Sequence, residues 1–179
     1  MQMAGIKQGC TLVYRTIGQD FAYRQGKLIA LSGNIVYVIS NQGVPALGLK
    51  IATINVLDEH AKPEPPYFAY LETTNGTTAK SKFLHSDSPD TPRARYFSFQ
   101  LDEGVQKVMG DIATGSKAII GFNRKKGGLD VLVPLDLSVI ESTASDLGFN
   151  RRHSDETLHL FRSCVREVTE LALERMKSQ

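Results

Sequence analysis

Alternation of apolar and polar residues with a period of two dominates the first two thirds of this chain. Every second residue of the run 129–137 is apolar: Leu129, Val131, Val133, Leu135 and Leu137. The run 96–101 alternates in the same way, with Phe97, Phe99 and Leu101 on one face. Successive side chains of a strand point to opposite faces, so these runs suit strands and not helices. The pattern predicts a mainly β fold over residues 10–137.

Turn-forming residues divide this region into strands. Ser32-Gly33-Asn34 predicts one turn, and Asn75-Gly76 predicts a hairpin whose type I′ turn has positive φ at both positions. Residues 85–95 form a polar segment with two prolines, which predicts a loop. A further hairpin is predicted around 124–128. Pro134 lies in its second arm and has no N–H to donate, so this arm is expected at the edge of a sheet.

Three helices are predicted. Asp102 is placed to cap a short helix that Gly115 ends. Ser138 and Glu141 have the spacing of a capping box, which predicts a second short helix that Gly148 can end. The last helix begins at Ser154 and carries an apolar stripe of Leu158, Phe161, Cys164, Val165, Val168, Leu171 and Ala172.

These elements together predict one domain over residues 1–179, strand-rich from 10 to 137 and helical from 138 to 178. The predicted architecture is an antiparallel β-sandwich or barrel with two short helices and a C-terminal helix packed on it. Strands and helices do not alternate regularly enough for a parallel α/β sheet.

The chain has two cysteines, Cys10 at the start of the first strand and Cys164 on the apolar face of the last helix. A bond between them would join the two ends of the domain and would indicate an oxidising compartment. The alternative is a pair of buried thiols, because free cysteine is among the most buried residue types. Two cysteines are too few for a structural zinc site.

Charge and hydropathy say little about the partner or the cellular compartment of this chain. The net charge of +2 favours neither a polyanion nor an acidic partner, and no apolar run is long enough for a membrane span. Residues 1–9 lack the apolar core of a signal peptide. We therefore expect either a mature exported chain or, if Met1 is the native start, a cytoplasmic one. The sequence does not indicate the oligomeric state.

No constellation of residues commits the chain to a reaction. His85 and Asp87 flank a serine, but neighbouring residues cannot form a hydrolase triad, which brings its members from separate parts of a fold. His153, Asp155 and His159 offer two or three metal ligands near the start of the last helix. A solvated first helical turn explains them as well, and we predict neither a metal site nor a cofactor.

Basic residues form one candidate binding patch. Arg124, Lys125 and Lys126 lie at a predicted hairpin tip, while Arg151 and Arg152 precede the last helix. If these groups meet in space, they form a surface for nucleic acid. The competing interpretation is that they keep an edge strand soluble.

The stretch from Asp102 to Cys164 resembles bacterial periplasmic domains of the invasion-associated locus B type. The resemblance rests on Gly-Ser-Lys-Ala-Ile-Ile-Gly-Phe (115–122), Val-Leu-Val-Pro-Leu-Asp-Leu-Ser (131–138), and a serine followed by a helical cysteine (154–164). It implies a small, β-rich exported domain with disulfides and no established active site.

From these observations we expect a non-enzymatic exported or periplasmic domain that binds a protein or a cell-envelope component. Its contact surfaces would be the edge near Pro134 and the loops 60–66 and 85–95. The alternative is a cytoplasmic or phage-type protein that uses the basic patch for nucleic-acid binding or assembly.

Overall fold

A computed structural model describes residues 2–3, 6–7, 9–40, 43–56, 65–115, 117–137, 139–145, 148–154 and 156–177. Its strands are β1 (Gln2–Met3), β2 (Ile6–Lys7), β3 (Gly9–Asp20), β4 (Lys27–Ile39), β5 (Pro45–Asn55), β6 (Phe68–Glu72), β7 (Phe83–Asp87), β8 (Arg95–Gln100), β9 (Ala118–Asn123), β10 (Val131–Leu135), β11 (Val139–Ser145) and β12 (Gly148–Ser154). Its helices are α1 (Glu103–Thr114) and α2 (Glu156–Lys177).

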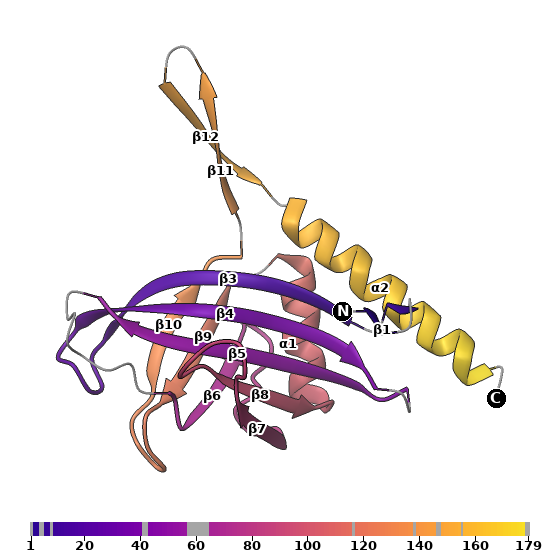
Figure 1. The fold of residues 1–179 in the computed structure, drawn as a ribbon, viewed down its shortest axis with the longest axis horizontal. Helices are drawn as coiled ribbons and strands as arrows, with labels where there is room; N and C mark the ends of the chain where they lie inside the picture. Colours follow the sequence, from indigo (N-terminus) through magenta and orange to yellow (C-terminus); the bar gives the residue numbers. More distant parts are fainter. Residues whose placement is uncertain are drawn as a thin grey trace.

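The body of the molecule consists of two antiparallel sheets (Figure 1). The larger sheet has the strand order β3-β4-β5-β8-β7, and the smaller one has the order β10-β9-β6. The predicted mainly β, antiparallel fold with a C-terminal helix is therefore confirmed. Long neighbouring strands pair without interruption, as between Gly9↔Val38 and Asp20↔Lys27.

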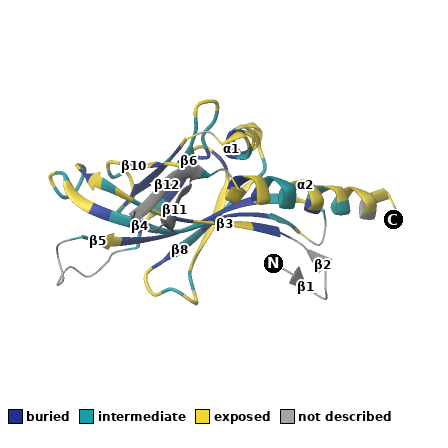
Figure 2. Cartoon of the chain, turned by 90° about the horizontal axis from the view of Figure 1, so that it is seen from above, coloured by how far each residue is buried: buried dark blue, intermediate teal, exposed yellow. Residues whose placement is uncertain are grey.

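Both sheets contribute one face to a common core (Figure 2). The larger sheet buries side chains such as Leu31, Leu49 and Phe97, and the smaller sheet buries Ile120 and Val133. Alternate residues of β8 and β10 are more exposed, which is the period-two burial seen in the sequence. This packing fixes which strand edges remain open.

Strand β10 lies against β3, where the two sheets meet. The Thr16 hydroxyl donates a hydrogen bond to the Pro134 carbonyl (2.9 Å), and the Tyr23 hydroxyl donates one to the Leu129 carbonyl (2.7 Å). Pro134 is in an edge strand of its sheet, as predicted. That edge is nevertheless taken up by contacts with β3.

Helix α1 has the predicted caps. An Asp102 carboxylate oxygen accepts a hydrogen bond from the Val105 N–H (2.9 Å), and Gly115 adopts a left-handed conformation (φ 82°) that ends the helix. Val105, Val108 and Ile112 are buried in the core. The caps are local interactions, which is why the sequence alone could place both ends.

Helix α2 packs on the start of β3. A disulfide joins Cys10 to Cys164, with a Cα–Cα distance of 5.9 Å, so the predicted bond is present. The helix buries Leu158, Phe161 and Val168. These residues belong to the predicted apolar stripe.

The second short helix predicted from Ser138 and Glu141 is wrong. Residues 139–145 and 148–154 form a hairpin, paired from Val139↔Ser154 to Ser145↔Gly148, that projects away from the two sheets (Figure 1). Ser138 itself lies outside the described residues. The β-branched residues that follow it favour strands, and this preference overrides the capping signature. The helical part of the C-terminal segment therefore begins with α2 at Glu156, and not at residue 138 as predicted.

The structure also contradicts two of the predicted turns. Strand β4 runs straight through Ser32-Gly33-Asn34. Gly33 is needed because a side chain there would collide with the Lys50 carbonyl and the Tyr14 hydroxyl, which hydrogen-bond to each other (2.8 Å). The type I′ turn at Asn75-Gly76 is wrong because neither residue has positive φ. This segment packs on α1 instead.

Candidate functional site

Strand β7 forms the outer edge of the larger sheet. It pairs with β8 in the register Phe83↔Phe99 to Asp87↔Arg95, and with no other strand of the described residues. All five of its residues are exposed. Sequence reasoning placed His85 and Asp87 in a loop, which is wrong because β8 offers an edge on which this segment continues the sheet.

The hydrogen bonds at its two ends show which backbone groups of β7 are free. The Gln100 N–H donates to the Lys82 carbonyl (2.8 Å), and the Ser88 N–H donates to the Ala94 carbonyl (2.9 Å). In an antiparallel ladder, alternate residues bond to the partner strand. Residues 82, 84, 86 and 88 therefore face β8, and the N–H and carbonyl groups of 83, 85 and 87 point away from the sheet.

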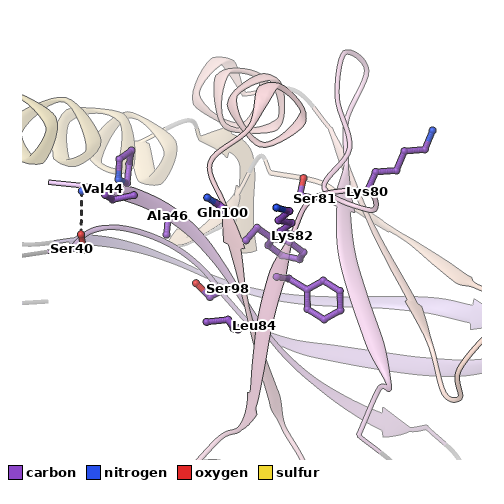
Figure 3. A pocket seen from close by; sticks show the side chains of 12 residues that line it. Ser40, Val44, Ala46, Lys80, Ser81, Lys82, Leu84, Ser98 and Gln100 are labelled. Carbon is purple, nitrogen blue, oxygen red and sulfur yellow. Dashed lines mark hydrogen bonds between the residues drawn. The ribbon is translucent and has the colours of Figure 1, made fainter. Parts of the chain in front are cut away.

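A groove of about 760 Å³ runs along the outer face of the sheet beside β7 (Figure 3). Its floor is formed by Ser98 and Gln100 of β8, whose partners across the sheet are Gly48 and Ala46. Val44 forms one wall, and Lys82 and Leu84 form the other. Leu84 is 79% exposed, so the groove wall is apolar and open to solvent.

Aromatic rings gather on the opposite face of β7. The ring of Phe83 lies 4.7 Å from that of Phe68 in β6 and 6.0 Å from that of Phe97 in β8, measured between centroids. His85 lies 6.1 Å from Phe97 and 6.2 Å from Phe83. Phe83 remains 38% exposed. A side chain placed beside it would bury further aromatic surface.

The two ends of β7 differ in charge. Lys80 and Lys82 are exposed at its start, and buried Ser81 between them is hydrogen-bonded to the Asp102 carboxylate. At its end, Asp87 accepts a hydrogen bond from Arg95 (3.2 Å). The start of the edge therefore carries positive charge, while the acid at its end is compensated by Arg95.

Asp90, three residues beyond β7, forms a second ion pair at this end. Its carboxylate pairs with the ammonium of Lys50 (2.8 Å). Hydrogen bonds from Lys50 and Ser88 lower the pKa of Asp90 to about 2, so it is ionised at neutral pH.

The structure describes only some of the predicted polar candidates. His85 and Asp87 share one face of β7, and His85 contacts aromatic rings. His159 is exposed on α2, the structure describes only the backbone of His153, and Asp155 lies outside the described residues. In the described part of the chain, no three His, Cys, Asp or Glu side chains could hold a metal ion.

One residue of the predicted basic patch does not face solvent. The Arg124 side chain is 10% exposed and pairs with Asp20, so it does not face solvent as predicted. Lys125 and Lys126 are exposed at the hairpin tip. Only the backbone is described at 151 and 152, and the meeting of Arg151 and Arg152 with the tip stays a prediction.

Sequence reasoning missed the lysines at the start of β7 and the groove. The available signal was Lys80 and Lys82 just before Phe83-Leu84, since lysines commonly protect an exposed sheet edge. Of the predicted contact surfaces, the edge near Pro134 lies against β3, and residues 60–64 lie outside the described chain. Residues 85–87 do belong to the open edge.

Neither helix in the described residues is long and apolar enough to cross a membrane. Comparison with protein-family models, with curated proteins and with solved structures found no match to this chain. The candidate site is therefore argued from its own geometry.

Proposed function

We propose that this chain is an exported, non-catalytic domain that binds an extended segment of a partner protein along strand β7. The observation that carries the proposal is the row of outward-pointing backbone groups at 83, 85 and 87, flanked by a groove on one face and aromatic rings on the other. An extended peptide can add a strand to such an edge.

Both faces of β7 would contribute to recognition. Backbone hydrogen bonds supply affinity, and pockets for alternate side chains supply specificity. One set of ligand side chains would lie beside Leu84, at the wall of the groove, and the other would lie beside Phe83 and His85. The preferred segment is therefore extended and carries apolar residues at alternate positions.

The Cys10–Cys164 disulfide supports the exported part of the proposal. Disulfides persist in secreted and periplasmic proteins and are rare in the cytosol, where thiols are kept reduced. The periplasm or the exterior of the cell is the compartment that fits this bond. The partner is then another extracytoplasmic protein, with an envelope component as the wider class.

A proline at position 85 tests the proposal. The His85 N–H points away from β8, so His85→Pro removes one donor for an added strand while leaving the β7–β8 ladder intact. The probe is a surface-displayed library of random twelve-residue peptides, selected on the native disulfide-bonded protein. We expect enriched sequences to lose binding at least tenfold on His85→Pro.

The matched variant is His85→Thr, which keeps the backbone donor and removes the ring. It should bind the same peptides far more tightly than His85→Pro, and circular dichroism should show the same fold for both. Equal binding to both variants, or a selection that enriches nothing, would contradict strand addition. Oligonucleotide binding that weakens steeply with salt would instead favour the nucleic-acid alternative.

A further inference from the structure

Positive charge at the start of strand β7, unpaired among the described residues, bears on the direction of a bound strand. Lys80 and Lys82 lie at its start, and Asp87 lies at its end, next to the Asp90–Lys50 pair. A strand added antiparallel to β7 places its carboxyl-terminal end beside the lysines. A parallel strand would place that end beside Asp87.

The antiparallel direction is favoured on two grounds. Antiparallel pairs are slightly more stable per residue than parallel ones and are two to three times more common. Every pairing in the larger sheet is already antiparallel, including β7 with β8. An incoming strand in that direction continues the existing pattern.

The two lysines are available to an anion. Both side chains are exposed, and neither has an ion-pair partner among the described residues. Acids near them are already engaged. Asp87, further along the same strand, pairs with Arg95 (3.2 Å). Asp102 caps α1, and Glu103 pairs with Lys107 (2.6 Å). The hydrogen bond between Ser81 and Asp102 holds the segment between the lysines in place.

Lys82 also lines the groove, beside Leu84 and Gln100 (Figure 3). A carboxylate at this end would therefore meet an ammonium group, while the preceding side chains on this face lie beside Leu84, at the wall of the groove. This environment suits the end of a chain better than an internal segment, because only the end carries a backbone carboxylate to pair with the lysines.

We infer that the segment bound by β7 is the carboxyl terminus of a partner protein, antiparallel to β7, with its terminal carboxylate at Lys80 and Lys82. The inference rests on the proposed strand addition and names its ligand. Charge complementarity at the start of β7 and the direction of the sheet carry it.

The test uses the tightest peptide from a display library with free carboxyl termini, synthesised once as the free acid and once as the amide. Affinities for the native protein are measured by isothermal titration calorimetry. We expect the amide to bind at least tenfold more weakly. Lys80→Gln with Lys82→Gln should weaken the free acid to the level of the amide and leave the amide nearly unchanged.

The matched control removes two exposed lysines elsewhere, Lys27→Gln with Lys117→Gln, and changes the net charge equally. It should preserve the preference for the free acid. If it weakens the free acid as much as the first pair does, the effect is general electrostatics and the inference fails.

The two proposals fail separately. Equal affinity for acid and amide, together with loss of binding on His85→Pro, would overturn the carboxyl-terminal inference and leave strand addition standing. Binding that His85→Pro does not weaken would overturn strand addition itself, and the inference with it. A library that enriches no peptide would overturn both.

Discussion

Arg124 and Asp20 form a buried ion pair across 104 positions of the sequence, with a distance of 3.1 Å between Nη2 and Oδ2. The Asp20 side chain is fully buried, and its other carboxylate oxygen accepts the Tyr23 N–H. The Arg124 guanidinium also lies over the rings of Tyr23 and Phe122, at 5.8 Å from each centroid. The pair ties the end of β3 to the β9–β10 hairpin.

Removing one partner of this pair should destabilise the fold strongly. Asp20→Asn leaves a buried guanidinium without its counter-charge, and breaking a buried pair in this way costs about 3–5 kcal/mol. Asp20→Asn with Arg124→Met should lose less than Asp20→Asn alone, because no buried charge remains. Urea unfolding measures both, and Lys125→Ala, at the exposed neighbour, should stay within about 0.5 kcal/mol of the wild type.

The disulfide should contribute substantially to stability. The double variant Cys10→Ala/Cys164→Ala removes the covalent link between β3 and α2, so the unfolded chain gains conformational freedom. Loss of a native disulfide costs about 2–5 kcal/mol. Thermal unfolding should show a lower Tm for this variant and for the reduced wild type. Adding reductant to the double variant should change nothing further, and a fall in its Tm would point to another effect of the reductant.

The cap at Asp102 should make the stability of α1 depend on pH. Its hydrogen bond with the Val105 N–H holds the pKa of the Asp102 carboxyl below its ordinary value of about 3.9. A lowered folded-state pKa stabilises the fold above the unfolded value, and this contribution is lost as the pH falls through the folded-state pKa. Asp102→Ala should cost about 1 kcal/mol at pH 7.

Urea unfolding at pH 7, 5 and 3 checks this prediction. The difference between wild type and Asp102→Ala should be the same at pH 7 and 5 and smaller at pH 3. Asp102→Asn keeps a capping side chain that does not titrate, so it should lose little at pH 7 and gain on the wild type at pH 3. A difference that stays constant down to pH 3 would contradict the assigned role of the carboxylate.

Two glycines should respond to alanine in opposite directions. A side chain at Gly121 would collide with the ring of Tyr70, so Gly121→Ala should destabilise the small sheet by about 1–3 kcal/mol. Gly110 is exposed in the middle of α1 with open space around it, so Gly110→Ala should stabilise by about 0.5–1 kcal/mol. Chemical denaturation of the two variants tests both signs, and destabilisation by Gly110→Ala would contradict the helix assignment.

Local patterns made a large part of the fold predictable. The alternation in 129–137 and 96–101 located β10 and β8, and the cap residues located both ends of α1. The failures also have local origins. The capping signature at Ser138 and Glu141 competed with β-branched neighbours, and Gly33 was interpreted as a turn although its role is close packing beneath Tyr14.

The sequence by itself determined the β-rich class, the C-terminal amphipathic helix and the cysteine pair, because period, capping and residue type act within a few residues of each other. Only the tertiary structure decided which edges are covered and which charges are buried. Pro134 marks an edge, but contact with β3 occupies it, while no described strand pairs with the outer edge of β7. Arg124 looks solvent-facing in a basic run, yet a partner 104 positions away buries it. These outcomes depend on segments that meet only after folding, so short-range sequence patterns could not reveal them.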